Sequence, residues 1–152
     1  MIERFEQFSF AVSSIYRSIQ KIEREEMESY GYRGAFAQYL VTLNRFPNGL
    51  TAAELCDTCD RDKAAVSRIV SEMEEKGLVY REMKAGTAYR AKLKLTEEGS
   101  KAARFVCTKA SAAVEATGGE LTDIERKNLY TALELIMKNL QIIAKDGIPQ
   151  IK

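Results

Sequence analysis

The most constraining feature of the sequence is the stretch from residue 51 to residue 95, where two short helical segments are followed by a strand-like segment. The first segment opens with Thr51-Ala52-Ala53-Glu54, in which the Thr and the Glu have the spacing of a capping box. It is expected to end about Thr58. Asp60 suits the tight turn that follows, because Asp tolerates left-handed backbone better than most residues.

A second helix is predicted from Asp62, an acceptable N-cap, to a C-terminal stop at Gly77. Its apolar residues fall at helical spacing and are Val66, Ile69, Val70 and Met73. Beyond Gly77 the period changes to that of a strand, with Tyr89, Ala91, Leu93 and Leu95 alternating with Arg90, Lys92 and Lys94. Residues 84–87 suit a hairpin tip. This order predicts a helix-turn-helix with an attached β-wing.

Long helices are predicted at both ends, over about residues 3–28 and from a capping-box pattern that starts at Thr122. Each has a narrow apolar seam, formed by Phe5, Phe8, Val12, Ile15, Ile19 and Ile22 in the first and by Leu129, Leu133, Ile136, Leu140 and Ile143 in the last. The seams can pack within the chain or against a partner subunit, and their length favours a homodimer.

The expected fold class is therefore mainly α with a small β-wing. Its parts are a winged helix-turn-helix at residues 33–99, a connecting helix at residues 100–118, and dimerisation helices at residues 1–32 and 119–152.

The distribution of charge points to double-stranded DNA as the partner. The net charge is only +1, yet residues 84–94 contain four bases and no acid, so a surface for a polyanion should be local. A recognition helix enters the major groove with its first turns, where small, hydroxyl and cationic side chains reach bases and phosphates. The expected contacts are Lys63, Ala64, Ala65, Ser67 and Arg68, whereas Glu72, Glu74 and Glu75 would lie where the helix leaves the groove.

The wing would supply a second contact. Arg90 is expected to enter the minor groove, and Lys84, Lys92 and Lys94 are expected to lie near phosphates. Each basic segment alone would be ordinary solvated surface. Their order along the chain favours DNA binding.

Other classes of function lack a site. The chain has no His, and no Gly-rich phosphate loop appears, so neither an enzyme nor a cofactor is expected. No apolar run is long enough to cross a membrane, and the acids in MIERFEQF do not suit a signal peptide, so a cytoplasmic location is expected.

Cys56 and Cys59 have the spacing of half a zinc site, but the other half is missing, and no metal site is expected. An inert, buried thiol is the favoured interpretation. A thiol-based redox response through these two residues is kept as an alternative.

The central stretch LTAAELCDTCDRDKAAVSRIVSEMEEKGLVYRE, with DKAAVSRIV and EEKGLV above all, resembles the helix-turn-helix of the MarR family of bacterial transcriptional regulators. The later LKLTEEG resembles the strand and helix that end the family's wing. The resemblance implies a homodimeric winged helix-turn-helix protein that binds a pseudo-palindromic operator, usually as a repressor. It also implies release by a small, often aromatic ligand held between the dimerisation and DNA-binding lobes.

Carried over residue by residue, the resemblance assigns the recognition-helix contacts named above and adds a phosphate contact by Thr51. The chain departs from the family in two places. Thr87, Ala88 and Tyr89 stand where the family often has Asp-Arg-Arg, and Arg61 stands where the turn is commonly apolar.

Aromatic side chains near the junction of the first two helices are candidates for a ligand pocket, although such residues are more often core. They are Tyr16, Tyr32, Phe36 and Tyr39. A further alternative is that the winged helix binds a protein instead of DNA. Binding that weakens steeply with salt would distinguish DNA from a protein partner.

Overall fold

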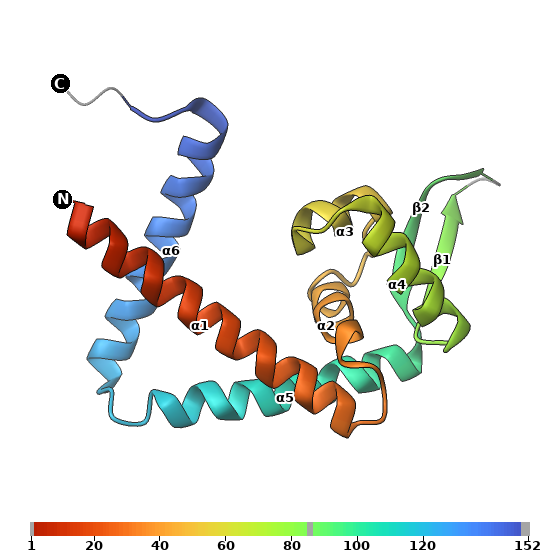
Figure 1. Ribbon diagram of the computed structural model, residues 1–152, viewed down its shortest axis with the longest axis horizontal. Helices are drawn as coiled ribbons and strands as arrows, with labels where there is room; N and C mark the ends of the chain where they lie inside the picture. Colours follow the sequence, from red (N-terminus) through yellow and green to blue (C-terminus); the bar gives the residue numbers. More distant parts are fainter. Residues whose placement is uncertain (1, 85–86, 150–152) are drawn as a thin grey trace. The chain divides into compact units, whose positions relative to one another are not determined.

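The computed structural model describes residues 2–84 and 87–149, and the side chains of residues 3–83 and 91–149. Within this part the chain forms α-helices and one two-stranded antiparallel sheet (Figure 1). In chain order the elements are α1 (Ile2–Ser29), the 3₁₀ helix η1 (Gly34–Phe36), α2 (Ala37–Arg45), α3 (Ala52–Cys59), α4 (Lys63–Glu75), β1 (Val79–Lys84), β2 (Thr87–Leu95), α5 (Glu97–Thr117) and α6 (Asp123–Asp146).

The expected fold class is confirmed: the described residues are mostly helical, and the single hairpin follows a helix-turn-helix formed by α3 and α4. The chain divides into two compact units, Met1–Ala112 and Ala113–Lys152. None of the helices in the described ranges is both long enough and apolar enough to cross a membrane.

The hydrophobic core of the first unit lies under the helix-turn-helix. Leu55 from α3, Val66 and Val70 from α4, Leu93 from β2 and Leu40 from α2 are almost completely buried. The apolar side of each short helix thus faces the same cluster, which is what the helical spacing predicts. Ala102, Ala103 and Val106 of α5 and Met27 of α1 complete the cluster.

The wing is built as the alternation predicts. Ala91 and Leu93 are buried while Lys92 and Lys94 are partly exposed, so one face of β2 packs on the core and the other carries the cations. β1 and β2 pair with Val79 opposite Leu95 and Glu82 opposite Lys92, and the register shifts before Lys84 pairs with Thr87. On its other edge, β2 exchanges backbone hydrogen bonds with Leu50 through Leu93.

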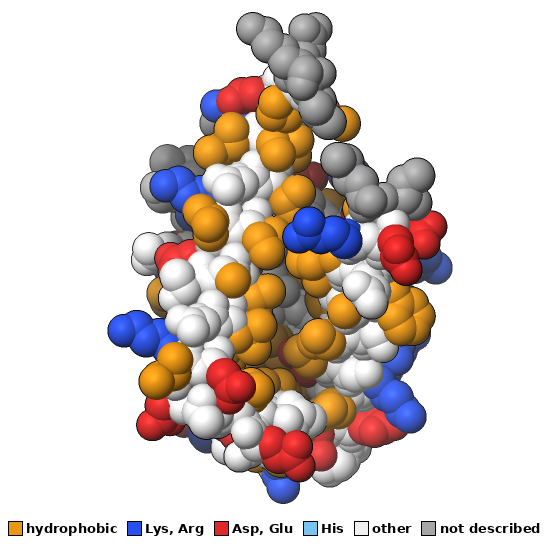
Figure 2. Space-filling model, turned by 90° about the vertical axis from the view of Figure 1, so that its left-hand side faces the viewer, with side chains coloured by type: hydrophobic (Ala, Val, Ile, Leu, Met, Phe, Trp, Pro, Cys, Tyr) orange, Lys and Arg blue, Asp and Glu red, His pale blue; other side chains and the backbone are white. Residues whose placement is uncertain are grey.

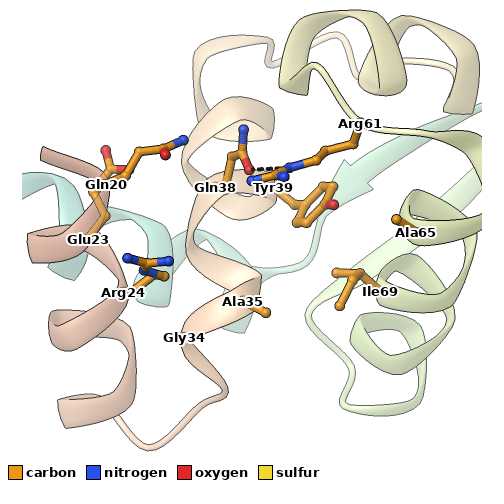
Figure 3. A pocket seen from close by; sticks show the side chains of 10 residues that line it. All are labelled: Gln20, Glu23, Arg24, Gly34, Ala35, Gln38, Tyr39, Arg61, Ala65 and Ile69. Atoms are coloured by element: carbon orange, nitrogen blue, oxygen red, sulfur yellow. Dashed lines mark hydrogen bonds between the residues drawn. The ribbon is translucent and has the colours of Figure 1, made fainter. Parts of the chain in front are cut away.

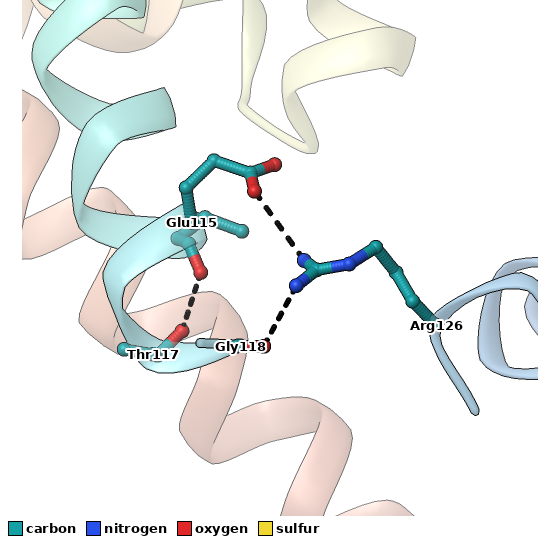
Figure 4. Close-up of polar contacts among 5 residues, drawn as sticks. Glu115, Thr117, Gly118 and Arg126 are labelled. Atoms are coloured by element: carbon teal, nitrogen blue, oxygen red, sulfur yellow. Dashed lines mark hydrogen bonds and ion pairs between the residues drawn. The ribbon is translucent and has the colours of Figure 1, made fainter. Parts of the chain in front are cut away.

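In the second unit, the corner between α5 and α6 is held by polar contacts (Figure 4). Arg126 of α6 donates to the carbonyl oxygen of Gly118 at 2.8 Å and pairs with Glu115 at 3.3 Å. Thr122 and Glu125 form both bonds of the predicted capping box at the start of α6. The corner is therefore closed by interactions that satisfy the end of one helix and the start of the next.

Large apolar side chains are exposed on both terminal helices. No described residue of α6 is buried, and Ile124 is 73% exposed, while on α1 Phe10 is 72% exposed. The predicted seam residues Phe5, Phe8, Val12 and Ile15 on α1 and Leu129, Leu133 and Leu140 on α6 are also exposed. Figure 2 shows a face of the molecule on which hydrophobic side chains are frequent.

Candidate nucleic-acid interface

The N-terminal end of α3 is fixed by a complete capping box. The Thr51 hydroxyl accepts a hydrogen bond from the Glu54 amide at 3.2 Å, and the Thr51 amide donates to the Glu54 carboxylate at 2.7 Å. The bond from the Thr51 amide to the carboxylate is the main reason that the pKa of Glu54 is lowered from its ordinary value. The Thr51 hydroxyl also donates to Glu54 at 2.9 Å, so the predicted phosphate contact by Thr51 would have to exchange this bond.

The turn between α3 and α4 depends on one left-handed residue. Asp60 has φ 51° and ψ 54°, the only positive φ outside glycine among the described residues. The amide of Arg61 donates to the Cys56 carbonyl at 3.1 Å, which closes the end of α3. The role expected for Asp60 from its tolerance of left-handed backbone is thus confirmed.

Helix α4, the predicted recognition helix, begins at a side-chain cap. The Asp62 carboxylate accepts from the Ala65 amide at 2.9 Å, and this bond is the main reason that the pKa of Asp62 is lowered. The first turn of α4 therefore has its free amides partly satisfied and faces solvent with the positive end of the helix dipole.

The side chains predicted to contact DNA are mostly on one exposed face of α4. Lys63, Ala64, Ser67 and Arg68 are exposed, while Val66 and Val70 point into the core. Ala65 departs from the set, because it is half-buried and lines a hollow on the other side of the helix.

Sequence reasoning missed Ser71, which is exposed on the same face as Ser67 and Arg68. Its position four residues after Ser67 and three after Arg68 was a usable signal.

Two of the three acids in the later turns of α4 are bound by arginines. Arg33, just before η1, contacts Glu72 through two hydrogen bonds, one of them 2.6 Å long. Arg81 of β1 contacts Glu74 at 2.9 Å. These pairs join α4 to the connector after α1 and to the wing, a role that the sequence interpretation of these acids did not include.

Two of the predicted wing cations, Lys92 and Lys94, have side chains that the structure describes, and both are bonded within the protein. Lys94 pairs with Glu82 across the hairpin at 2.9 Å, which raises the pKa of the lysine, and Lys92 donates to the carbonyl of Gly49 at 3.4 Å. Both nitrogens thus have partners within the protein. The side chains of Lys84 and Arg90, the other predicted wing contacts, lie outside the described residues.

A hollow of about 300 Å³ lies between α1, the start of α2 and α4 (Figure 3). Side chains from α1, from α2 and from the helix-turn-helix surround it: Gln20, Glu23, Arg24, Gln38, Tyr39, Arg61, Ala65 and Ile69. Burial raises the pKa of Glu23, with Arg45 acting weakly in the opposite direction. The lining combines two guanidinium groups with an apolar wall that includes part of the recognition helix.

The structure does not bring the four predicted pocket aromatics together. Tyr39 lines the hollow and Phe36 is in the core. Tyr32 donates to Glu98 at 3.5 Å, and Tyr16, exposed on α1, accepts from Gln20.

The three cysteines are free thiols. Cys59 is buried and donates to the Thr42 hydroxyl at 3.6 Å, and burial raises its pKa. Cys107 and Cys56 are both half-buried, and desolvation by burial raises the pKa of Cys107 as well. A raised pKa disfavours the reactive thiolate. In the described ranges no three His, Cys, Asp or Glu residues are grouped as metal ligands would be.

Comparisons with known proteins relate this chain to one family of transcriptional regulators. Residues 31–88 match the model of the MarR family. The structure is similar to that of a MarR transcriptional regulator from Methanosarcina mazei Go1, with a TM-score of 0.77 and 25% identity over 91% of this chain and 99% of that one.

It is also similar to a MarR family transcriptional regulator from Listeria monocytogenes complexed with a 26mer DNA. That match has a TM-score of 0.73 and 19% identity, over 93% of this chain and 96% of the other. The S. aureus MepR–DNA complex gives a TM-score of 0.67 and 19% identity, over 87% and 97%.

A search of curated proteins finds no match. The family model therefore matches this chain over α2, the helix-turn-helix and the first strand of the wing, and the chain shares the fold of solved MarR-family regulators over most of its length.

Proposed function

We propose that this protein is a sequence-specific DNA-binding transcriptional regulator in which the first turns of α4 contact the major groove. The observation that carries the proposal is the exposed face formed by Lys63, Ala64, Ser67 and Arg68 at the capped start of a helix whose opposite side is in the core. Small and cationic side chains at this end let the backbone approach base edges and phosphates. Solved relatives with the same fold include complexes with DNA.

The proposal extends to a homodimer on a pseudo-palindromic operator. The apolar seams of α1 and α6 are exposed in the single chain, and water contact over such surfaces is unfavourable at about 25 cal/mol per Å². A two-fold partner would cover both seams and present two copies of α4 to two half-sites.

Repression is the proposed sign of regulation, because a bound dimer excludes other proteins from the same DNA. The hollow beside α4 is the proposed place for a releasing ligand, since Ala65 and Ile69 of the recognition helix form part of its wall. A molecule bound there would contact the element that reads DNA, so its occupancy and DNA affinity would be linked.

Fluorescence-anisotropy titration tests the proposal. The DNA is the region upstream of the protein's own gene, the control is a scrambled duplex, and both are measured across a salt series. Binding with a dissociation constant of about 10⁻⁸ M or tighter, two chains per site and a steep loss of affinity with salt is expected. Equal and weak binding to the upstream duplex and to the scrambled duplex, with no tighter-binding sequence in a random library, would contradict the proposal. A salt-insensitive complex with a protein partner would favour the alternative that the winged helix binds a protein.

A further inference from the structure

The side chain of Gln38 on α2 is bonded to both sides of the turn between α3 and α4. Its Nε2 donates to the carbonyl oxygen of Cys59 at 2.9 Å. Its Oε1 accepts from Nε of Arg61 at 3.3 Å, the bond drawn in Figure 3. Gln38 is itself half-buried. Both ends of one amide are thus used, and their partners flank the left-handed residue Asp60.

The backbone hydrogen bonds at this turn are local to α3, whereas the thiol of Cys59, the last residue of α3, donates to the Thr42 hydroxyl of α2 at 3.6 Å. The Arg61 amide donates back to the Cys56 carbonyl, and the Asp60 amide makes a long contact of 3.4 Å with the Asp57 carbonyl. These bonds end α3 but do not join the turn to α2. Gln38 therefore supplies a side-chain connection from the turn to α2, just before α4 begins at its Asp62 cap.

The position of this connection matters for the proposed DNA contact. Arg68 lies six residues beyond Asp62, a distance of about 9 Å along a helix, so a small rotation at the turn displaces its side chain. Base contacts require atomic register, whereas phosphate contacts tolerate such a displacement because they depend mainly on charge. A looser turn should consequently reduce specific binding more than non-specific binding.

We propose that Gln38 is a positioning residue for DNA recognition: by holding Cys59 and Arg61 it fixes the direction in which α4 presents Ser67 and Arg68. The effect on DNA affinity rests on the DNA-binding function proposed above. The proposal also gives a role to Arg61, which stands where the MarR family commonly has an apolar residue. In this chain the Arg61 side chain donates to Gln38 on α2.

Three variants separate the two bonds. Gln38→Leu removes both while keeping a similar volume, and Gln38→Glu keeps an acceptor for Arg61 but cannot donate to the Cys59 carbonyl. Arg61→Met removes one bond at an exposed position. Gln141→Leu is the matched control, because Gln141 is an exposed glutamine on α6 that lies outside the hollow.

Two measurements are made on the full chain: affinity for operator and scrambled duplexes, and amide hydrogen exchange at Arg61 and the first turn of α4. Because it removes both hydrogen bonds, Gln38→Leu should weaken operator binding about tenfold, which is about 1.4 kcal/mol, and scrambled binding less than about twofold. Gln38→Glu and Arg61→Met should fall between this variant and wild type. Exchange should accelerate in Gln38→Leu and stay at the wild-type rate in Gln141→Leu.

Operator affinity of Gln38→Leu equal to that of wild type, or an equal loss on both duplexes, would overturn the proposal. If Gln38→Leu does not fold, Arg61→Met decides, and unchanged operator affinity in that variant overturns it. If wild type itself does not distinguish the duplexes, the proposed function fails, and the exchange data still decide this inference. An Arg61 amide protected as strongly in Gln38→Leu as in wild type would show that Gln38 does not hold the turn.

Discussion

Arg68 is the single residue on which the proposed specificity depends most directly. It is exposed on α4 in the same face as Ser67, and its planar guanidinium suits bidentate contact with guanine. Nothing in the described contacts ties it to a carboxylate by an ion pair, in contrast to Arg33 and Arg81.

Replacing Arg68 with Ala is expected to weaken operator binding by about 1–3 kcal/mol and to reduce discrimination at one base pair of each half-site. Arg104→Ala is the matched control, since Arg104 is an exposed arginine on α5 away from the helix-turn-helix. Anisotropy titrations with single-base operator variants measure both effects. Equal losses in the two variants would indicate a general charge effect and exclude base reading by Arg68.

For Gly99, near the start of α5, helix propensity and tertiary packing predict opposite effects of a substitution by Ala on stability. Helix propensity alone favours Ala over Gly by about 1 kcal/mol. In the structure, however, a Cβ at Gly99 would overlap the backbone carbonyl of Leu78, which is a part of the protein that cannot rotate away.

Gly99→Ala is therefore expected to destabilise the protein by about 1–3 kcal/mol, because the first turn of α5 must move off the start of β1. Urea unfolding followed by circular dichroism measures the change. Ser111→Ala, on an exposed side of the same helix, is the control and should be neutral or slightly stabilising. A stabilised Gly99→Ala variant would mean that α5 packs differently against Leu78.

At the scale of one element, three kinds of interaction fix the position of α4. Its N-terminus is capped by Asp62, its later turns are joined by ion pairs to Arg33 and Arg81, and its buried face contacts the core. The ion pairs are exposed, so each contributes little, about 0–1 kcal/mol, and their main effect is on orientation. Most of the stability of α4 comes from burial of Val66, Val70 and Met73.

The cap of α4 predicts a pH dependence of stability. The folded-state pKa of Asp62 lies below its ordinary value of 3.8, mainly because the carboxylate accepts from the Ala65 amide. A lowered pKa means that the cap stabilises the fold above the unfolded pKa, and that this stabilisation is lost as the pH falls through 3.8 towards the folded pKa.

Asp62→Asn keeps a capping oxygen but does not titrate. The advantage of wild type over this variant in free energy of unfolding should therefore shrink as the pH is lowered from about 6 to about 3. Urea unfolding at a series of pH values measures it, with Asp57→Asn on α3 as a control that makes no cap. A pH-independent difference would contradict the assigned role.

At the scale of the whole molecule, the terminal helices carry large apolar side chains that the single chain leaves exposed. α6 has no buried residue among those described, and its seam residues Leu133 and Leu140 are exposed. Such a helix is marginal alone, because most helical stability in proteins comes from packing an apolar face.

Leu133→Glu is expected to shift the protein from a dimer towards a monomer and to abolish tight operator binding, because one subunit contacts only one half-site. Sedimentation velocity gives the mass, and anisotropy gives the affinity. Lys138→Glu is the control on the same helix and should leave the mass unchanged. A variant that stays dimeric would place the subunit interface elsewhere.

Local signals in the sequence were enough to predict the helix-turn-helix with its caps at Thr51 and Asp62, the cap of α6 at Thr122, and the two-faced strand β2. Each depends on neighbours a few residues apart, so the information is contained in a short window. The exposed cationic face of α4 could be predicted for the same reason, since its members follow from the helical period.

Contacts between distant segments could not be predicted in this way. The pairing of Glu72 with Arg33, the neutralisation of Lys94 by Glu82 and the separation of the four aromatics depend on which surfaces meet after folding. The sequence by itself determined the order and type of the elements, because propensity, capping and periodicity act locally. Only the tertiary structure decided that Ala65 faces a hollow and that Gln38 holds the turn, because these are properties of packed surfaces that the chain brings together from far apart.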